Sequence, residues 1–361
     1  MMEDFTIVVP THNRHALLDR VLPTLLDFNV PILIIDSSDT RHPTAAEHEQ
    51  IDYVHCPNAE LLHKLRKYIT ERVRTSYMMM NADDIFPIKS NVSKCLTFLK
   101  ENPDYSSAQG ASYYNSAGVF KKYRDDYALY QADSNCPGTR MMQHFLCGSH
   151  NFYSVMRTKH WQEILLNFPN LAHPQLSERF QILMTLILGK TKRFDNFFHL
   201  VDDGESCSWD VPTRGYHWHS KKFVADYETF RTTIADYLCS KENITLKCAY
   251  RYIDATIALQ RSQYTPVIEK PKKIKWWQLK TPNDDIRYRP TKLPHEKIKR
   301  EINYFFKKLL GQKQKQDRKQ HEKLVAQGYE LLQRTIAESG TDARAEIKAV
   351  AKLFYKIDCA S

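Results

Sequence analysis

The chain has 361 residues, and its 52 lysine and arginine residues outnumber its 42 aspartate and glutamate residues to give a formal net charge of +10. Hydrophobic residues make up 42% and charged residues 26%, a globular composition that excludes disordered and fibrous chains. The longest apolar run, residues 180–188, is too short to span a bilayer. With no secretory signal pattern at the start and no CxxC pair among eight scattered cysteines, we expect a cytoplasmic protein with reduced thiols.

Apolar, β-branched runs at residues 5–10 and 31–36 predict two strands, and leucines at helical spacing in residues 16–28 predict a helix between them. The pattern predicts further strands at 51–55, 76–80, 106–114 and 191–198, and further helices at 59–72, 91–101, 157–168, 176–189, 221–240 and 243–262. From residue 293 onward it is helical, at roughly 295–310, 315–338 and 342–357. This order predicts an α/β fold, Rossmann-like, with a mostly parallel sheet flanked by helices.

Polar residues follow three of the predicted strands. In an open α/β sheet, ligands bind at the carboxyl ends of the strands, which places residues 11–14, 36–39 and 81–84 along one edge. The last of these segments contains Asn81, Asp83 and Asp84. Adjacent carboxylates repel each other unless a cation lies nearby, and Mg²⁺ and Mn²⁺ prefer oxygen ligands. Two interpretations are open: these side chains bridge a metal to a nucleoside diphosphate, or the aspartates cap the next helix.

The chain carries three motifs in order, Thr6-Ile-Val-Val-Pro-Thr-His-Asn-Arg14, Ile34-Ile-Asp-Ser-Ser38 and Asn81-Ala-Asp-Asp-Ile-Phe-Pro87. Together they resemble the opening of family 2-type glycosyltransferases with the GT-A fold, and the similarity extends from residue 5 to about residue 210. The resemblance implies a nucleotide bordered by Pro10, Thr11, Asn13 and Arg14.

The same resemblance assigns the acidic residues. It implies that Asp36 contacts the base of the nucleotide. Asn81 replaces the first aspartate of the family's Asp-x-Asp motif and would bond a ribose hydroxyl. Asp83 would ligate Mg²⁺ or Mn²⁺, with Asp84 beside it.

The candidate general base is Glu178. In an inverting transfer, a carboxylate takes the proton of the acceptor hydroxyl as that hydroxyl attacks the anomeric carbon, which typically contributes about 10²–10⁴-fold. In the family resembled, this residue tends to lie at the start of a helix. Ser177 would cap such a helix here and leave Glu178 in the first turn. The alternative is an ordinary acidic residue of a first turn; Asp202 and Asp203 are reserve candidates and predicted acceptor contacts.

Further sugar or acceptor contacts are expected from two polar clusters. His150 and Asn151 precede a predicted strand, where the alternative is a structural turn. His217 and His219 would share a face on a strand and touch the diphosphate or the metal, although His-x-His needs further ligands to hold a metal. Lys64 could meet a diphosphate, but the favoured expectation is that it lies on a solvated helix face. The chain lacks GxxxxGK[ST] and GxGxxG motifs, which excludes P-loop and dinucleotide sites of those types.

The surplus positive charge is concentrated in residues 266–323, which hold 18 lysines and arginines against 7 aspartates and glutamates. Three interpretations of this segment are open: docking on an anionic membrane surface, packing on the catalytic body, or binding of nucleic acid with Trp276 and Trp277 stacking on bases. We divide the chain into a GT-A glycosyltransferase domain at 1–220, a helical segment packing on it at 221–265, and a basic, mainly helical extension at 266–361.

The sequence therefore predicts a metal-assisted, inverting glycosyltransferase of polysaccharide biosynthesis. It would move a sugar from a nucleotide-sugar donor, with a UDP-type donor favoured, to a hydroxyl of a glycan or lipid-linked glycan. We expect it in the cytoplasm, peripheral at the inner face of the plasma membrane. Two alternatives are open: a sugar-phosphate nucleotidyltransferase, although no glycine-rich basic loop follows the first strand, and a nucleic-acid-binding or nucleic-acid-modifying protein that uses the basic arm.

Overall fold

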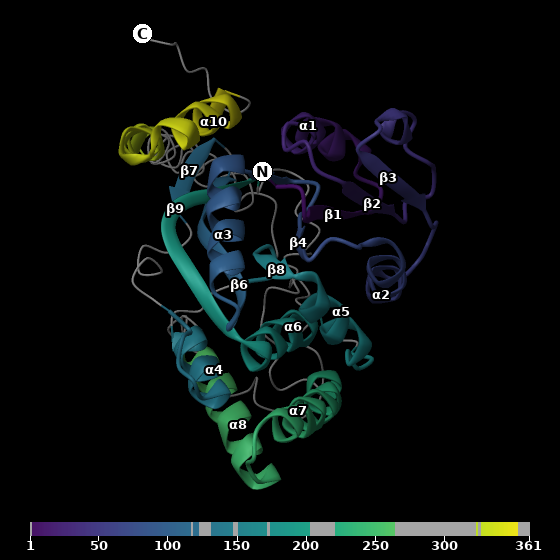
Figure 1. The fold of residues 1–361 in the computed structure, drawn as a ribbon, viewed down its shortest axis with the longest axis vertical. Helices are drawn as coiled ribbons and strands as arrows, with labels where there is room; N and C mark the ends of the chain where they lie inside the picture. Colours follow the sequence, from purple (N-terminus) through teal and green to yellow (C-terminus); the bar gives the residue numbers. More distant parts are fainter. Residues whose placement is uncertain are drawn as a thin grey trace, which may run out of the picture.

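The computed structural model describes residues 2–116, 118–122, 131–146, 151–171, 174–202, 221–263, 323 and 326–352. A single sheet runs through this part of the chain, with helices on both of its faces (Figure 1). The strands are β1 Phe5–Thr11, β2 Ile32–Asp36, β3 Ile51–His55, β4 Tyr77–Met80, β5 Ile85–Pro87, β6 Tyr105–Ser116, β7 Val119–Lys122, β8 Val155–Arg157 and β9 Lys190–Asp202.

The helices alternate with the strands through the first half of the chain and then follow one another. They are α1 His15–Leu26, α2 Leu61–Arg72, α3 Lys89–Glu101, α4 Pro137–Leu146, α5 Thr158–Leu166, α6 Pro174–Leu188, α7 Lys221–Lys241, α8 Leu246–Gln263 and α10 Thr341–Lys352. Residues 326–338 are also helical, and a 3₁₀ helix, Ala45–Glu47, lies between β2 and β3. None of the helices in the described ranges is both long and apolar enough to cross a bilayer.

The strand order of the sheet is β3-β2-β1-β4-β8-β6-β9-β5, with β7 paired to β6. β3, β2, β1 and β4 are parallel neighbours, and so are β6 and β9. β8 joins these two parts, because it runs antiparallel to both β4 and β6. In the register of β1 and β2, Thr11 lies beside Asp36. The carboxyl ends of the parallel strands therefore meet at one edge of the sheet, as the sequence predicts.

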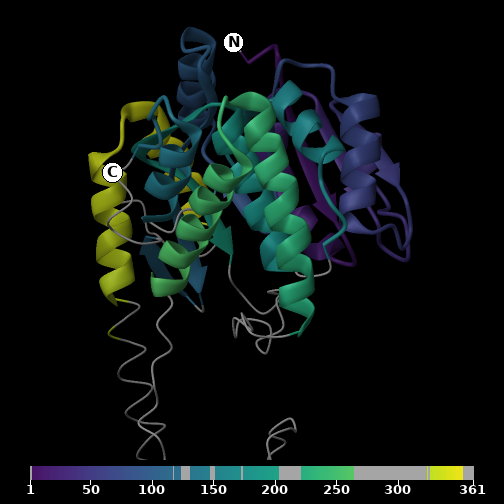
Figure 2. The same cartoon turned by 90° about the horizontal axis from the view of Figure 1, so that it is seen from below.

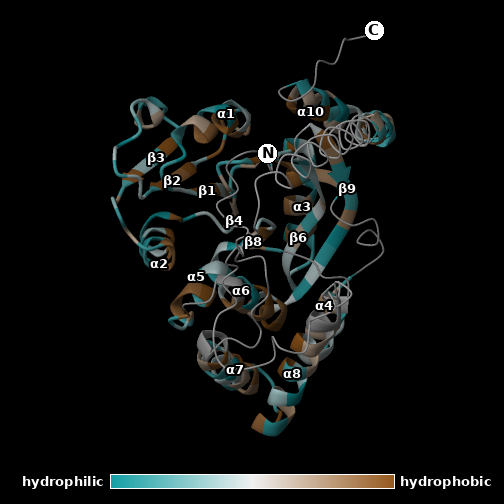
Figure 3. Ribbon diagram, turned by 180° about the vertical axis from the view of Figure 1, so that it is seen from behind, coloured by the Kyte–Doolittle hydropathy of each residue, from teal (hydrophilic) through white to brown (hydrophobic). Residues whose placement is uncertain are grey.

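Each face of the sheet carries its own hydrophobic cluster, because side chains alternate between the faces along a strand. Ile7 and Val9 of β1 belong to the cluster formed with α1, α3 and the C-terminal helices. Val8 belongs to the cluster formed with α2, α4, α5, α6, α7 and α8. Figure 3 shows the hydrophobic residues of α5 and α6 in brown within this second cluster. The parallel strands are thus packed on both faces by hydrophobic clusters.

The helices at the C-terminal end pack on the body of the protein (Figures 1 and 2). Leu332 and Ile347 are buried in the cluster on the α3 face of the sheet. The carboxylate of Glu346 accepts hydrogen bonds from the backbone N–H of Ser90 at 3.1 and 2.9 Å. A Cβ on Gly328 would come within 2.7 Å of backbone atoms of Phe120 in β7. The absence of a side chain at Gly328 therefore allows the helix at 326–338 to pack closely against β7.

The predicted strands and helices of residues 5–114 are confirmed to within a few residues at each end, and so are the helices predicted between 157 and 262. The sequence analysis missed β5, β7 and α4. In α4, the Pro137-Gly138 pair has the composition of a turn. Tertiary packing decides otherwise: a Cβ on Gly138 would lie 2.4 Å from the ring of Tyr252, so glycine lets α4 pack against α8. The predicted helix at 295–310 lies outside the described residues.

Candidate active site

Two aspartates and an arginine meet at the carboxyl ends of β1 and β4. The guanidinium of Arg14 spans both carboxylates, since Nη1 lies 2.7 Å from Oδ1 of Asp83 and Nη2 lies 2.6 Å from Oδ2 of Asp84. The hydroxyl of Thr11 donates to the other oxygen of Asp83, Oδ2, at 2.7 Å. Pro10 precedes Thr11 on β1. The structure therefore brings together the residues predicted to border a nucleotide and those predicted to hold a metal.

Asp83 is only 2% exposed. Burial raises the pKa of its carboxyl to about 6, although the hydrogen bond from Thr11 and the charge of Arg14 act in the opposite direction. Taking a carboxylate out of water disfavours its ionised form, and a nearby cation restores that form. The position of Asp83 therefore favours the arrival of additional positive charge.

The donor set fits a divalent cation that is shared with a ligand. Within the described ranges, no three His, Cys, Asp or Glu side chains gather where they could hold a metal ion. Asp83 and Asp84 supply two carboxylates, and Mg²⁺ typically takes one or two carboxylates and completes its shell with phosphate oxygens and water. The two aspartates are thus suited to Mg²⁺ or Mn²⁺ carried on a diphosphate, and unsuited to a closed cage of protein ligands.

Asp36 ends β2 and is completely buried. Its Oδ1 accepts the backbone N–H of Ser38 at 2.8 Å, and its Oδ2 accepts the hydroxyl of Tyr53 at 2.5 Å and lies 2.9 Å from Nε2 of His15. Burial alone would raise its pKa, but these hydrogen bonds outweigh burial and hold the pKa below its ordinary value. A base that bonded Asp36 directly would have to replace one of these partners, so the predicted base contact stays a prediction.

Asn13 shapes the loop between β1 and α1. Its backbone has φ of 53°, in the left-handed region, where asparagine is tolerated better than most residues. Its N–H donates to Oγ of Ser38 at 2.7 Å, and its side chain exchanges hydrogen bonds with Asp39, at 3.1 Å to the carboxylate and at 3.0 Å from the N–H. These bonds tie the loop after β1 to the loop after β2.

Lys64 is buried in α2, and the expectation that it lies on a solvated helix face is wrong. It is 3% exposed, and its Nζ donates to the carbonyl of Thr11 at 2.9 Å, to the carbonyl of Ile35 at 3.2 Å and to Oγ of Ser37 at 2.8 Å. Burial lowers its pKa, and nearby negative charges such as that of Asp36 oppose the shift only in part. The ammonium group therefore joins the carboxyl ends of β1 and β2.

Replacing Lys64 by methionine is expected to lower the free energy of unfolding by about 1–3 kcal/mol, because three buried acceptors lose their donor. Lys67 lies on the same helix with an exposed side chain near the Tyr68 ring. Lys67→Met is the matched control and should change stability by about 0.5 kcal/mol or less. Urea unfolding measures both variants. Equal stabilities of the two variants would show that Lys64 does not hold the strand ends together.

Asn81 lies at the end of β4 and is 1% exposed. Its amide nitrogen donates to the carbonyls of Ala82 at 2.8 Å and Ile85 at 3.0 Å, and so closes the turn that presents the two aspartates. Its Oδ1 is buried with no hydrogen-bond partner among the described residues. The predicted ribose contact stays a prediction, and this amide oxygen is the atom available to accept a ribose hydroxyl.

Glu178 lies in α6, but the local structure differs from the one predicted. The helix begins at Pro174, so Ser177 is inside it and Glu178 is beyond the first turn. Proline favours the first position of a helix because its φ is already suitable, and α6 begins two residues before the predicted start at 176. Glu178 therefore does not occupy the first-turn position that the sequence analysis predicted. Burial raises the pKa of Glu178, and the charge of Arg179 offsets the rise only in part.

The phenol of Tyr153 is influenced by the charges of both Glu178 and the acidic pair. It lies just before β8, which neighbours β4 in the sheet. Burial raises the pKa of its phenol, and the negative charges of Asp84, Glu178 and Asp83 raise it further. The charges of three carboxylates therefore act on this one phenol. The sequence analysis did not single out Tyr153, because nothing in its local pattern shows that carboxylates from two other segments influence it.

Asp202 ends β9 beside the same edge, where its N–H donates to the carbonyl of Asp84 at 2.9 Å. Its carboxylate is 2.7 Å from Nη1 of Arg20 and accepts a longer bond of 3.4 Å from the amide of Asn115. With its charge paired in this way, Asp202 is placed to support the strand end. As an acceptor contact or reserve base it stays a prediction.

Asn151 has a buried side chain with no hydrogen-bond partner for either polar atom within the described part of the chain. A buried amide without partners costs stability, so this position is suited to a ligand that supplies them. The other predicted contacts, His150, Asp203, His217 and His219, lie outside the described residues, as does nearly all of the basic segment 266–323, including Trp276 and Trp277.

Comparison with known proteins relates these features to a known family. Residues 6–164 match the model of glycosyl transferase family 2, and no curated protein matches the chain. The crystal structure of S. aureus TarS 1–349 is similar, with a TM-score of 0.51 at 10% identity over 76% of this chain and 76% of that chain. Another crystal structure of S. aureus TarS has a TM-score of 0.49 at 11% identity, over 76% of this chain and 46% of that chain.

The family match begins in β1, ends in α5 and includes all three motifs that carry the predicted nucleotide and metal residues. The likeness to the solved structure concerns the fold. Residues 6–164 are therefore similar to glycosyl transferase family 2, and this match together with the GT-A-type α/β fold supports a glycosyltransferase.

Proposed function

We propose that the chain transfers a sugar from a nucleotide-sugar donor, with a UDP-type donor favoured, to a hydroxyl of a glycan or lipid-linked glycan, with inversion at the anomeric carbon. One observation carries this proposal: Arg14 spans the carboxylates of Asp83 and Asp84 at the ends of β1 and β4, inside the segment that matches the family model. An acidic pair suited to a diphosphate thus lies where the predicted nucleotide residues meet, and the charge of Glu178 acts on the phenol of Tyr153 together with the charges of that pair.

The donor would bind along the carboxyl ends of β1, β2 and β4. Pro10, Thr11 and Asn13 would border the nucleotide, Asn81 would accept a ribose hydroxyl through its unpaired oxygen, and Asp36 would contact the base or hold the residues that do. Arg14 would offer its guanidinium to the diphosphate, since guanidinium groups bind phosphate oxygens in pairs.

Asp83 and Asp84 are the residues that would hold Mg²⁺ or Mn²⁺. Such a cation, when bound, would neutralise the charge that develops on the departing diphosphate. Arg14 already lies across both carboxylates, so this chain brings a positive charge of its own to the same place. The buried Asp83 would be kept ionised by these two sources of positive charge.

Glu178 would take the proton of the acceptor hydroxyl. A general base works best when its pKa approaches the working pH, and burial raises the pKa of Glu178 in that direction. Asn151, with its unpartnered buried amide, would bond a sugar hydroxyl, and His150, Asp202, Asp203, His217 and His219 are proposed as further sugar or acceptor contacts.

The domain division and the cellular place of the enzyme are also proposals. We propose a catalytic domain at 1–220, a helical segment at 221–265, and an extension at 266–361 whose basic part, 266–323, docks on an anionic membrane surface. This fits an enzyme of polysaccharide biosynthesis at the inner face of the plasma membrane. The concentration of 18 lysines and arginines in 266–323 supports the docking role.

The test is a thermal-shift panel of UDP, GDP, CDP, CMP and dTDP sugars, each with and without Mn²⁺. A donor at a hundred times its Kd should stabilise the fold by about 2.7 kcal/mol, and we expect this with a UDP sugar and Mn²⁺. Arg14→Gln should lose the shift, and Arg72→Gln, which changes an exposed arginine of α2 that pairs with Asp52, should keep it. A flat response to every sugar nucleotide would contradict the proposed donor class.

A further inference from the structure

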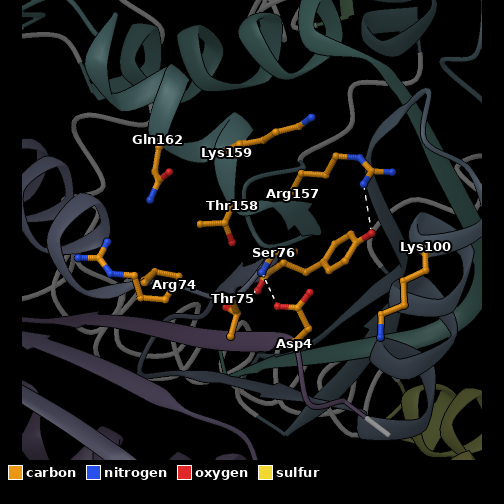
Figure 4. Close-up of a pocket in the computed structure, with 11 residues that line it drawn as sticks. Asp4, Arg74, Thr75, Ser76, Lys100, Arg157, Thr158, Lys159 and Gln162 are labelled. Atoms are coloured by element: carbon orange, nitrogen blue, oxygen red, sulfur yellow. Dashed lines mark hydrogen bonds between the residues drawn. The ribbon is translucent and has the colours of Figure 1, made fainter.

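A cavity of about 750 Å³ opens at the edge of the sheet opposite the candidate active site (Figure 4). Three of its lining residues lie at the starts of elements. Asp4 directly precedes β1, Ser76 directly precedes β4, and Thr158 is the first residue of α5. Pockets that bind small molecules commonly have volumes of about 300–1,000 Å³. This cavity therefore has the size of a small-molecule site, and none of the roles proposed above uses it.

The lining of the cavity is strongly cationic. Arg74, Lys100, Arg157 and Lys159 contribute positive charges, and the one carboxylate among the lining residues, Asp4, accepts the N–H of Ser76 at 2.6 Å. Figure 4 shows these charged groups arranged around Thr158. An excess of positive charge in a concave surface raises the local concentration of anions.

The two arginines and the two lysines differ in what they contact. The guanidinium of Arg157 donates to the carbonyls of Tyr105 and Leu99, and that of Arg74 donates to carbonyls in the last turn of α2. These hydrogen bonds to neutral carbonyl groups hold both guanidinium groups in position and leave their positive charge unpaired by these contacts. Lys100 and Lys159 are exposed, so their ammonium groups can move toward a ligand.

The first turn of α5 also faces the cavity. Helix α5 has nine residues, its N-cap residue Arg157 makes no side-chain capping bond, and its first turn holds no acidic residue. The positive end of a helix dipole attracts anions, and the first backbone N–H groups of a helix lack partners within the helix. A negatively charged group in the cavity would meet this helix start together with the lysines.

An independent observation at the same place is the hydroxyl of Thr158. The residue is 4% exposed, and its Oγ1 is buried with no hydrogen-bond partner within the described ranges. Its N–H is already used, since it donates to the carbonyl of Ser76 at 2.9 Å. A buried hydroxyl without a partner costs stability, whereas an acceptor oxygen in the cavity would satisfy it.

We propose that this cavity binds a phosphate group, either free phosphate or the phosphate of a small phosphorylated sugar. The Thr158 hydroxyl donates to a phosphate oxygen, the start of α5 faces the anion, and Lys100 and Lys159 neutralise its charge. A phosphate supplies acceptor oxygens on every side, which matches a lining of donors and cations. The site lies at the opposite end of β1 and β4 from Arg14 and the aspartates, so it can be occupied together with the donor site.

The test is titration calorimetry of the full chain with inorganic phosphate and with glucose 6-phosphate at constant ionic strength. Thr158→Val should weaken binding about tenfold, because a hydrogen bond to a charged group is lost. Its melting temperature should be unchanged or higher, since the variant removes an unpaired buried hydroxyl. Tighter binding of glucose 6-phosphate would identify a sugar phosphate as the ligand, and equal binding would identify the phosphate group alone.

Two charge variants on one helix sharpen the result. Lys100→Gln should weaken phosphate binding about threefold, whereas Lys94→Gln, an exposed lysine of the same helix α3 outside the cavity, should not change it. Failure of the wild type to bind either probe would overturn the proposal. So would phosphate binding that Arg14→Gln removes and Thr158→Val leaves intact, because the anion would then lie at the carboxyl ends of the strands.

Discussion

Glu178→Gln is expected to lower kcat by about 10²–10⁴-fold with little change in donor binding, because the amide cannot take the proton of the acceptor hydroxyl. Glutamine has the same length and keeps one acceptor oxygen. Glu101 is an exposed carboxylate of α3, far from Tyr153 in the sequence, and Glu101→Gln is the matched control that should retain full activity. Steady-state kinetics with varied donor and varied acceptor separate the effect on kcat from any effect on KM.

The pH dependence gives this prediction a second readout. Burial raises the pKa of Glu178 above its ordinary value of 4.5, so the rate of the wild type should fall as the pH is lowered through that raised pKa. The effect on stability has the opposite sign. Between the ordinary and the raised pKa, the folded state binds more protons than the unfolded state, so stability falls as the pH rises through this window. The glutamine variant should lack this decrease, and should be no less stable than the wild type at neutral pH.

A Glu178→Gln enzyme with normal turnover would remove Glu178 from the mechanism. The reserve candidate Asp202 would then be tested by Asp202→Asn. Because Asp202 is 2.7 Å from Arg20, that substitution should be judged against Arg20→Gln. If both variants lose activity alike, Asp202 supports the strand end; a loss specific to Asp202→Asn indicates a direct role in proton transfer.

Asp83→Asn is expected to lower kcat by about 10²–10³-fold, the usual cost of removing one group that stabilises developing charge in the transition state. The amide oxygen can still accept the hydroxyl of Thr11, so the turn should persist. The asparagine cannot supply a negative charge to a cation on the diphosphate. Consequently the thermal shift produced by a sugar nucleotide should no longer depend on Mn²⁺.

Asp52→Asn serves as the control for Asp83→Asn, since Asp52 is an exposed aspartate of β3 that pairs with Arg72. It should leave both the kinetics and the Mn²⁺ response at wild-type values. If the Mn²⁺-dependent shift survives in Asp83→Asn, Asp83 is not a metal ligand. A loss of turnover with an intact shift would then assign Asp83 to the positioning of Arg14, through their 2.7 Å ion pair.

The predictable part of this fold is the part encoded by local patterns. Apolar runs ending in polar residues locate β1, β2 and β4, and the rule that parallel strands share an orientation then brings Thr11, Asp36 and Asp83 to one edge. The same patterns place α1, α2 and α3, because each carries hydrophobic residues at helical spacing. None of these steps requires knowledge of a contact distant in the sequence.

The unpredicted part depends on such distant contacts. Lys64 lies on the buried side of α2 with Leu65 and Ile69, so the helical spacing did indicate that it could be buried. Its three hydrogen-bond acceptors, however, lie on β1, on β2 and just after β2, and the local pattern does not reveal them. Tyr53 looks like an ordinary strand residue until its hydroxyl meets Asp36. The same holds for Tyr153, whose phenol is influenced by the charges of carboxylates from two other segments.

The packing of the C-terminal helices decides how the basic segment can be studied. Helix α8 and the helix at 326–338 are both anchored in the hydrophobic clusters of the body, so residues 266–323 connect two fixed points of one globular unit. Truncating the chain at 265 would strip buried residues such as Leu332 and Ile347 from the core along with the charge. The informative variants are therefore charge reversals within 266–323, which change the electrostatic potential of the surface and leave both anchors in place.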